Sequence, residues 1–457
     1  MTVTESSTAT ASASTPTTVF SNLRDHPGRP LDRPLTLAVA GAGARGSGYA
    51  TLAAAGDVPV SVTAVAEPRA PRRADFAERH GVPLDRRYAD WRELAAAPRL
   101  ADTVFITLQD AEHVAAVEAF AARGYDILLE KPMATSVEEC DLIAEAAESA
   151  GVSLTVCHVM RYAPYTRRLK ALLDSGRIGD LISVEHLEPI GYWHYAHSFV
   201  RGNWRRQDTS SFLLLTKSCH DIDWLSHITG RPVRAVSSFG SLSHFRPERA
   251  PAGAGERCVS CAVERDCPYS ALKLYPVGLR EGGVKRYFTR IAADELTETA
   301  VAEALAEGPY GRCVYACDND VVDHQQVTIE YAGGVTAALT LTAFTPQENR
   351  HTKLFGTHGQ ITGDGRHIEV YDFVTDERTV IDTDNGGSTA AEGHGGGDAG
   401  LIDAFVRAHH RGRPELLLTG ARESRDTHRV VFAAEHARRT GTVVRLTPTS
   451  DAEEPAQ

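Results

Sequence analysis

Three glycines stand where a nucleotide could bind. The apolar run Leu35–Ala40 predicts a buried strand, and Gly41, Gly43 and Gly46 follow it directly, before an Ala-rich stretch that predicts a helix over 47–55. In this arrangement the first glycine permits a tight turn, the second lets the backbone approach a pyrophosphate, and the third lets the helix pack closely on the strand. Free N–H groups at the helix N-terminus bind phosphate oxygens. The spacing therefore predicts a dinucleotide site.

An acidic residue follows at the distance expected for a ribose contact. Glu67 ends the next apolar run, 21 residues past Gly46. A carboxylate accepts a hydrogen bond from a ribose 2′-hydroxyl but repels a 2′-phosphate, so we expect NAD rather than NADP. Arg69, Arg72 and Arg73 could hold a phosphate, and they keep NADP open as the less favoured alternative.

Lys131, Lys217 and His220 could carry out proton transfer. Lys131 follows an apolar run, at the strand end where open α/β sheets bind ligands. On a helix, Lys217 and His220 would share one face. An imidazole suits the removal of a hydroxyl proton near neutral pH, and a lysine can donate to the reacting oxygen. We predict catalytic roles for all three; the alternatives are a lysine in a surface turn and a histidine that braces its helix.

Residues 191–206 are dense in aromatic and basic side chains. Aromatic faces stack on sugar rings, and arginine binds anionic groups through two hydrogen bonds. We expect this segment to line a substrate pocket, with an anionic sugar as a candidate ligand; the alternative is a packed loop with a solvated rim. The expected pocket residues are His194, His197, Arg201, Trp204 and Arg205.

Another polar pair, His394 and Asp398, is separated by three glycines. Because glycine permits a close approach of the backbone, these two side chains could reach a substrate hydroxyl. The alternative is a flexible loop in which Asp398 caps the following helix, predicted over 401–410.

Five of the eight cysteines lie within residues 240–318. Two close cysteines, a third nearby and a fourth from afar match a tetrahedral thiolate site for structural zinc, and a cytosolic compartment disfavours disulfides. We predict that zinc holds an insert that could cover the active site, with Cys317 as the rival fourth ligand. The predicted ligands are Cys258, Cys261, Cys267 and Cys313.

Alternating strands and helices are expected to position the first group of residues. Beyond the glycine turn, strands are predicted over 103–108, 125–129 and 154–158, with helices over 111–123 and 136–150 between them. This alternation indicates an α/β fold with a doubly wound parallel sheet.

The second half of the chain indicates an α+β domain. Residues 327–342 form two alternating segments around Ala332–Gly334, which is typical of a hairpin. Further strands are expected over 181–187 and 233–239, and a final helix over 422–440. The alternating Thr and Ala of the hairpin suggest an open sheet face through which the chain forms a homo-oligomer.

The domain boundaries follow from these elements. We assign 34–157 to a Rossmann domain and 158–446 to a substrate domain that contains the insert at about 240–318. The flanking segments 1–33 and 447–457 are expected to be disordered tails.

Composition limits the classes of protein. The chain has 457 residues, a formal net charge of −12 and 42% hydrophobic residues, a balance found in globular proteins. The acidic balance argues against a general nucleic-acid binder, and no apolar run is long enough to span a membrane. The Ser- and Thr-rich start lacks the features of a secretory signal. We therefore expect a cytoplasmic protein without nucleic-acid or membrane partners.

Several motifs together resemble the glucose–fructose oxidoreductase, inositol dehydrogenase and rhizopine-catabolism family (Gfo/Idh/MocA) over residues 35 to 446. They are Ile106–His113, Glu130–Pro132, Met160–Pro164, Ser175–Gly179, His220–Asp223 and Gly356–Gly359. The resemblance implies an N-terminal Rossmann domain, a C-terminal α/β domain with a large open antiparallel sheet, and NAD-dependent hydride transfer at a carbon of a sugar, polyol or sugar derivative. It also implies a cis bond before Pro132.

The resemblance assigns further site residues. It implies cofactor contacts for Ala44, Arg45, Thr107, Gln109, His113, Glu130 and Lys131, and substrate contacts for Arg161, Tyr162 and Asp221. His220 matches the histidine of the family pattern Asp-x-Gly-x-His-x-x-Asp, whereas Thr216 and Ser218 replace its first Asp and its Gly. The usual Lys–Asp–His relay therefore lacks its Asp here.

Another activity fits the same scaffold. The segment from His394 to Asp398 resembles one near the substrate in NAD-dependent N-acetylgalactosaminidases of this family. These redox-neutral glycosidases transiently oxidise C3, eliminate the aglycone and add water. With Thr216 in place of the usual Asp, this is the alternative to a sugar dehydrogenase. A nicotinamide-dependent sensor is a third option, disfavoured because binding alone needs neither Lys131 nor His220.

Overall fold

The computed structural model describes residues 30–293, 295–384 and 392–447. Within these ranges no helix is long and apolar enough to cross a membrane. Most of the predicted tails, 1–33 and 447–457, lies outside the described residues. The last part of the first tail is attached to the body, since Arg33 forms an ion pair with Asp102 at 2.7 Å.

The first domain is a doubly wound Rossmann fold, as predicted. Its six strands run parallel in the order β3-β2-β1-β4-β5-β6. They are β1 (Leu35–Ala40), β2 (Val60–Ala66), β3 (Arg87–Tyr88), β4 (Thr103–Ile106), β5 (Asp126–Leu129) and β6 (Leu154–Val156). The helices are α1 (Ala44–Ala55), α2 (Ala70–His80), α3 (Trp91–Ala96), α4 (His113–Ala121) and α5 (Val137–Ala150). Apolar residues of the strands point alternately to α1 and α2 on one face and to α3, α4 and α5 on the other.

The second domain is built on a nine-stranded sheet in the order β14-β13-β12-β11-β7-β10-β9-β8-β15. All neighbouring strands are antiparallel apart from β7 and β10, so the open antiparallel sheet implied by the resemblance contains one parallel pair. The strands are β7 (Leu181–Pro189), β8 (Val233–Ser241), β9 (His324–Tyr331), β10 (Thr336–Thr342), β11 (His351–Gly356), β12 (Gly359–Gly363), β13 (His367–Asp372), β14 (Glu377–Asp382) and β15 (Val444–Arg445). The helices are α6 (Pro164–Asp174), α7 (Tyr192–Tyr195), α8 (Leu213–Thr229), α12 (Gly397–Arg411) and α13 (Ala421–Thr440).

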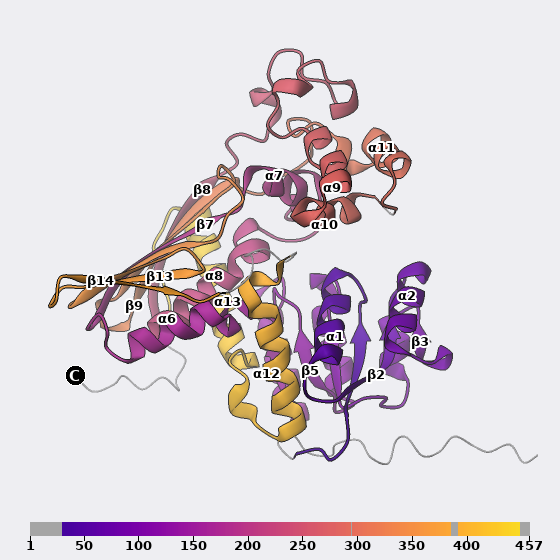
Figure 1. The fold of residues 1–457 in the computed structure, drawn as a ribbon, viewed down its shortest axis with the longest axis horizontal. Helices are drawn as coiled ribbons and strands as arrows, with labels where there is room; N and C mark the ends of the chain where they lie inside the picture. Colours follow the sequence, from indigo (N-terminus) through magenta and orange to yellow (C-terminus); the bar gives the residue numbers. More distant parts are fainter. Residues whose placement is uncertain (1–29, 294, 385–391, 448–457) are drawn as a thin grey trace, which may run out of the picture.

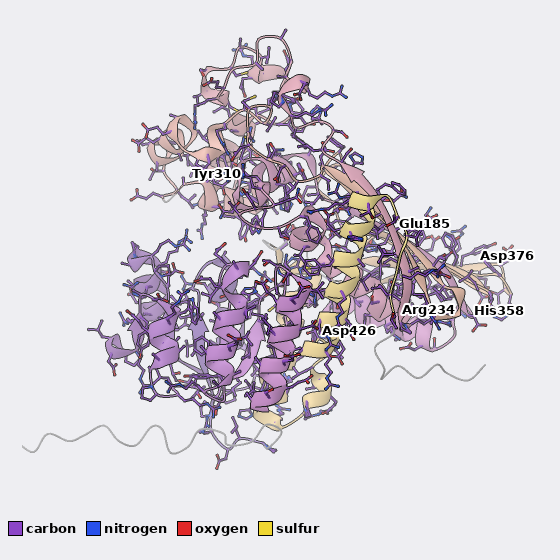
Figure 2. All side chains as sticks on the ribbon, turned by 180° about the vertical axis from the view of Figure 1, so that it is seen from behind. Glu185, Arg234, Tyr310, His358, Asp376 and Asp426 are labelled. Atoms are coloured by element: carbon purple, nitrogen blue, oxygen red, sulfur yellow. The ribbon has the colours of Figure 1, made fainter. Side chains whose placement is uncertain are left out.

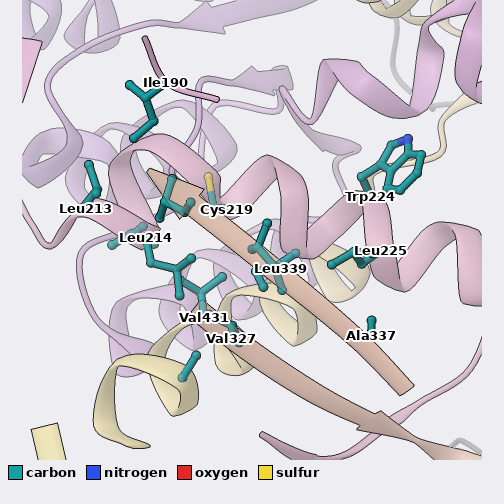
Figure 3. Packing of buried hydrophobic residues seen from close by; sticks show 14 of the residues in the cluster. Ile190, Leu213, Leu214, Cys219, Trp224, Leu225, Val327, Ala337, Leu339 and Val431 are labelled. Carbon is teal, nitrogen blue, oxygen red and sulfur yellow. The ribbon is translucent and has the colours of Figure 1, made fainter. Parts of the chain in front are cut away.

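Helices cover one face of this sheet. Figure 3 shows α8 lying over the strands that carry Val327, Ala337 and Leu339, with Val431 of α13 in the same cluster. Burial alternates along β9 and β10, so every second residue enters this core and the residues between them form the opposite, more exposed face. The core fixes α8, the helix that carries Lys217 and His220.

The insert lies between β8 and β9. It forms α9 (Tyr275–Glu281), α10 (Gly283–Ala292) and α11 (Glu298–Glu307) around a small apolar core of its own. Helix α11 begins at Glu298, where the Thr297 side chain caps it by accepting from the N–H of Ala300. Figure 1 shows the insert standing above α7 and the first domain, and Tyr310 marks it from behind in Figure 2.

Residues 191–206 are largely helical rather than an extended loop. Helix α7 continues into a turn of π-helix at Ala196–Arg201. This turn is buried over all six of its residues. The burial of the turn directs His197 and Arg201 into the protein interior.

Candidate active site

The glycine turn fits a pyrophosphate. A Cβ on Gly41, whose φ is +95°, would lie 2.4 Å from the carbonyl oxygen of Thr107, and one on Gly46 would lie 2.0 Å from the carbonyl oxygen of Gly41. The Cβ position of Gly43, in contrast, has no atom within 4 Å. No side chain caps α1, so its first N–H groups remain available to a ligand. Gly41 and Gly46 thus lie where the strand and the helix pack closely, whereas Gly43 lies beside open space in which an anion would bind.

A cavity of about 290 Å³ adjoins this turn. Glu67, Thr107 and Gln109 line it together with Gly41 and Gly43. Glu67 is buried at the end of β2, and its Oε1 accepts from the backbone N–H and the Nε–H of Arg69 at 3.1 and 2.8 Å. The cavity therefore offers a carboxylate to ribose hydroxyls, while the nearest arginine is engaged by that carboxylate. These features fit NAD.

Arg45 ties the glycine turn to the second domain. Its Nε–H donates to Glu130 at 2.8 Å, and its two Nη atoms donate to the Asp398 carboxylate at 2.8 and 2.9 Å. Asp398 lies in the first turn of α12, whose N-cap is a glycine, and Ala44 stands beside Arg45 at the start of α1. The ion pairs of Arg45 thus link the two domains.

The turn that carries Lys131 follows β5 at the carboxyl edge of the parallel sheet. The Lys131–Pro132 peptide bond is cis. His113 is fully buried below this turn, with Nδ1 3.0 Å from the carbonyl oxygen of Pro132. His113 therefore supports the turn and is not among the residues that line the nucleotide cavity. The Nζ of Lys131 donates to the carbonyl oxygen of Thr216 on α8 at 2.9 Å, which joins the first domain to the helix of His220.

A second cavity, of about 140 Å³, lies where the two domains and the insert meet. Six of the residues that the sequence singled out line it: Lys131, His194, Trp204, Lys217, His220 and His394. Others that sequence reasoning missed complete its wall, among them Glu188, Phe199, Tyr287, Phe288, Ile291, Gln347 and Arg350. The fold therefore brings the three predicted catalytic residues into one cavity.

His220 stands in this cavity without a hydrogen-bond partner among the described residues. Both of its ring nitrogens are buried and unpaired. Burial, together with the nearby charge of Lys131 and the neighbouring His158, holds the pKa of His220 well below its ordinary value. The imidazole is therefore neutral at pH 7, and one of its ring nitrogens offers a lone pair that can accept a hydrogen bond. Because a buried polar group without a partner costs free energy, the site favours a ligand that bonds to this ring.

His394 forms a dyad with Asp398 on the far wall. Its Nδ1 lies 3.0 Å from Oδ1 of Asp398, and its ring centroid lies 5.8 Å from that of His220. The φ of His394 is +49°, an uncommon conformation for a residue other than glycine. Burial lowers the pKa of His394, although Asp398 acts against this. The contact with the Asp398 carboxylate fixes this imidazole in the cavity wall despite the uncommon backbone conformation.

A buried ion-pair network forms part of the cavity wall. Arg350 donates to Asp221 and pairs with Glu188 at 2.8 Å, and Glu188 also pairs with the Nζ of Lys217 at 2.7 Å. Burial alone would raise the pKa of Asp221, but Arg350 and His186 outweigh it and hold the pKa below its ordinary value. Asp221, expected to bind substrate, instead orients Arg350, which does line the cavity.

Two of the expected pocket residues hold the insert. The ring of His197 stacks on Tyr310 at 4.6 Å between centroids, and its Nδ1 lies 2.8 Å from the hydroxyl of Tyr275. Arg201 is 1% exposed and donates to the carbonyl oxygens of Arg312 and Tyr269 at 2.7 and 2.9 Å. Neither side chain is among those that line the substrate cavity.

Three other expected substrate residues also lie elsewhere. Arg205 pairs with Asp318 at 2.8 Å on the partly exposed side of the insert. Arg161 forms a two-pronged ion pair with Asp223 at 2.7 and 2.8 Å, and Tyr162 accepts from the backbone N–H of Leu418 at 2.7 Å. The contacts of Arg161 and Tyr162 brace α8 and the chain before α13. None of the three side chains is among those that line the cavity.

The structure does not support the predicted zinc site. The insert brings two of the segments together, because Arg257 and Arg312 pair in an isolated antiparallel bridge. Even so, no three His, Cys, Asp or Glu side chains in the described part of the chain are grouped to hold a metal ion. The thiols have other contacts: Cys258 Sγ accepts from a backbone N–H at 3.4 Å, and Cys317 donates to the carbonyl oxygen of Cys313 at 3.2 Å. Cys261 and Cys267 likewise belong to no group of three metal-binding side chains among the described residues.

Comparison with known families identifies the scaffold. A model of the NAD-binding Rossmann fold of the Gfo/Idh/MocA oxidoreductase family matches residues 35–158, and the model of its C-terminal α/β domain matches residues 170–446. The chain belongs to this family. It is therefore an oxidoreductase with an NAD-binding domain, as the sequence motifs implied.

Curated relatives and solved structures agree with this assignment. The Bacillus subtilis protein YteT, named as an oxidoreductase, is 26% identical over 337 residues, which cover 70% of this chain and 75% of YteT. The trans-1,2-dihydrobenzene-1,2-diol dehydrogenase of Oryctolagus cuniculus is 36% identical over 120 residues, which cover 26% of this chain and 36% of that enzyme.

Solved structures share the fold of this family member over most of its length. An oxidoreductase from Agrobacterium radiobacter in complex with NAD+, L-tartaric acid and magnesium has a TM-score of 0.64 at 17% identity, with 90% of this chain and 98% of that chain covered. An inositol dehydrogenase homolog from Azotobacter vinelandii, complexed with NAD+, has a TM-score of 0.64 at 16% identity, with 92% and 99% covered.

Proposed function

We propose that this enzyme is an NAD-dependent dehydrogenase that oxidises a hydroxyl-bearing carbon of a sugar or polyol. The observation that supports this most directly is the cavity shared by Lys131 and His220, in which both nitrogens of His220 are unpaired. A substrate hydroxyl placed there would supply the missing hydrogen bond. The relatives named after an inositol and after a diol are compatible with such a substrate.

The nucleotide cavity would hold the cofactor through few side chains. Gly43 and the N-terminus of α1 would bind the pyrophosphate, and Glu67 would accept hydrogen bonds from a ribose. Bound NAD supplies the hydride acceptor of the reaction.

Two side chains would act on the substrate oxygen. The carbon–hydrogen bond breaks as a hydride leaves for the cofactor, the oxygen–hydrogen bond breaks as its proton passes to the imidazole of His220, and a carbonyl forms. Lys131 Nζ uses one N–H on the carbonyl of Thr216 and has two more to donate to the substrate oxygen. This donation stabilises the negative charge that develops on that oxygen. Lys217, fixed by Glu188, adds positive charge to the same wall.

The charges in the cavity favour a neutral substrate. Arg201 and Arg205, which suggested an anionic sugar, bind the insert instead. The two cations that line the cavity beside Lys131 are each paired with a buried carboxylate: Lys217 with Glu188, and Arg350 with Glu188 and Asp221. No lining arginine is thus left over for a carboxylate or phosphate within the described residues.

A redox-neutral glycosidase is the second candidate, and the His394–Asp398 dyad favours it. Elimination requires a second base that removes a proton from the carbon next to the oxidised one. His394 lines the same cavity as His220, with its ring held by Asp398. A hydratase from Escherichia coli, the 2,7-anhydro-N-acetylneuraminate hydratase, is 27% identical over 150 residues, which cover 33% of this chain and 39% of that enzyme.

One assay separates the two functions. The purified enzyme is mixed with NAD and D-glucose, D-galactose, D-xylose or myo-inositol, or with nitrophenyl glycosides of the same sugars. A dehydrogenase forms NADH in step with substrate consumption. A glycosidase releases nitrophenol without net NADH. Bound NAD with neither product would overturn both proposals.

We also propose that the enzyme forms a homo-oligomer through the open face of its nine-stranded sheet. On β10 this face presents Thr336, Ala338 and Thr340, small side chains that let a second sheet approach closely. Light scattering on a sizing column should give a multiple of the 49.4 kDa chain mass. Ala338→Arg should shift that mass to the monomer, and a monomeric wild type would refute the proposal.

A further inference from the structure

Helix α10 of the insert forms a wall of the substrate cavity. Tyr287, Phe288 and Ile291 line the cavity together, and their spacing places them on one side of the helix. The helix begins at Gly283, and Gly282 and Gly283, both at positive φ, turn the chain sharply back from α9. The insert therefore reaches the active site through one short helix.

The position of α10 is fixed by aromatic contacts. Phe288 packs edge-on against Trp193 at 5.1 Å and against His197 at 4.8 Å between ring centroids. His197 is itself held by Tyr275 and Tyr310 of the insert. Such pairs add stability beyond the burial of their area. These contacts direct His197 towards the insert, and they also hold α10 against the cavity.

Tyr287 lines the substrate cavity, and its hydroxyl is within reach of the charges on the Arg45 ion pairs. Burial raises its pKa; the charge of Arg45 acts against that rise, and those of Asp398 and Glu130 add to it. The phenol is therefore protonated at neutral pH, and it lies close enough to Arg45, Asp398 and Glu130 to respond to their charges. No group among the described residues accepts a hydrogen bond from this hydroxyl.

We propose that Tyr287 donates a hydrogen bond to a substrate hydroxyl, and that α10 limits the substrate to the size of one sugar ring. This inference rests on the proposed sugar or polyol oxidation. The cavity of about 140 Å³ is smaller than the sites of about 300–1,000 Å³ that take drug-sized ligands. Ile291 lines the cavity and is 37% exposed, so it lies where the cavity meets solvent.

Tyr287→Phe tests the hydrogen bond, because it removes the hydroxyl and keeps the ring. Steady-state rates are measured with NAD and D-glucose, D-galactose, D-xylose and myo-inositol, and NAD affinity is measured by fluorescence. We expect kcat/KM for the best of these substrates to fall about tenfold, which is what one hydrogen bond of about 1.4 kcal/mol gives. The change should lie mainly in KM, with NAD affinity unchanged. Arg290→Ala, on the exposed side of the same helix, is the matched control and should equal wild type.

Ile291→Ala tests the size limit. The ratio of kcat/KM for methyl β-D-glucoside to that for D-glucose should rise several-fold in this variant. If Tyr287→Phe equals wild type while Lys131→Ala is inactive, the inference fails and the proposed function stands. If NAD-loaded wild type neither oxidises nor binds any of these compounds in calorimetry, the proposed function fails and the inference fails with it.

Discussion

Acid should destabilise this enzyme through its buried histidines. Burial lowers the pKa of His428 and of His197 to about 3 in the folded protein, whereas a histidine in an unfolded chain titrates near 6.5. The unfolded state therefore binds more protons between these values. The stability that this difference provides is complete above about pH 6.5 and falls as the pH decreases towards about 3.

The size of the effect follows from the same values. Each such histidine changes the free energy of unfolding by about 1.4 kcal/mol per pH unit below about pH 6.5. Lowering the pH from 7 to 5 should thus cost about 2 kcal/mol for His428 alone. His428 Nε2 accepts the N–H of Met133 at 2.9 Å and its Nδ1 lies 2.7 Å from the carbonyl oxygen of Ser424, so the neutral ring is fully bonded.

Urea unfolding of wild type and His428→Gln at pH 7, 6 and 5 measures this. The variant should be less stable at every pH, but its loss between pH 7 and pH 5 should be smaller than that of wild type by about 2 kcal/mol. His358→Gln, at an exposed position in the turn between β11 and β12 that Figure 2 labels, controls for the loss of a histidine as such. Equal pH dependence in wild type and His428→Gln would refute the reasoning.

Three further predictions concern the two cavities. Gly46→Ala should lower the melting temperature by several degrees, because its Cβ would lie 2.0 Å from a backbone oxygen. Gly43→Ala should keep the wild-type melting temperature and weaken NAD binding at least tenfold, because its methyl group enters the open space where the pyrophosphate would bind. Equal effects of the two substitutions on the melting temperature would contradict this. Glu67→Ser should lower the ratio of kcat/KM for NAD to that for NADP at least tenfold, since it removes the acid and releases Arg69; an unchanged ratio would exclude Glu67 as the ribose ligand. Asp398→Asn should reduce kcat at least tenfold, because it weakens the hold on both His394 and Arg45, and full activity would show that the dyad plays no part in turnover.

The nucleotide half could be read from the sequence because its signals are local. The strand Leu35–Ala40 was predicted with the bounds that β1 has, and the glycine turn and Glu67 lie where the spacing indicates. In a β-α-β unit the residues that bind the nucleotide follow each other along the chain, so a pattern in one dimension specifies the site.

The substrate half could be read only in part. Lys217 and His220 lie on the same helix, so their position on one face of it could be predicted from their spacing. Arg350 and Glu188 come from distant strands and connections, and no local pattern distinguishes them. Arg201 was misplaced for a physical reason: its segment folds into a buried π-helical turn, where an arginine bonds to carbonyl oxygens of the insert instead of to a ligand.

The cysteine spacing also proved insufficient. It resembles a zinc site, but among the described residues no three His, Cys, Asp or Glu side chains are grouped so that they could hold a metal ion. What holds the insert in the structure is an apolar core with Tyr275 and Leu305, together with the contacts of His197 and Arg201.

We propose that Lys131 and His220 act on one substrate oxygen beside the cofactor. Rapid-mixing measurement of NADH formation in a single turnover tests it, using wild type, Lys131→Ala, His220→Ala and the double variant. Each single change should slow hydride transfer by about 100-fold or more while NAD affinity stays within a few-fold of wild type. The double variant should be little slower than the slower single variant, because the two groups act as a unit. Wild-type NADH formation in either single variant would contradict the account.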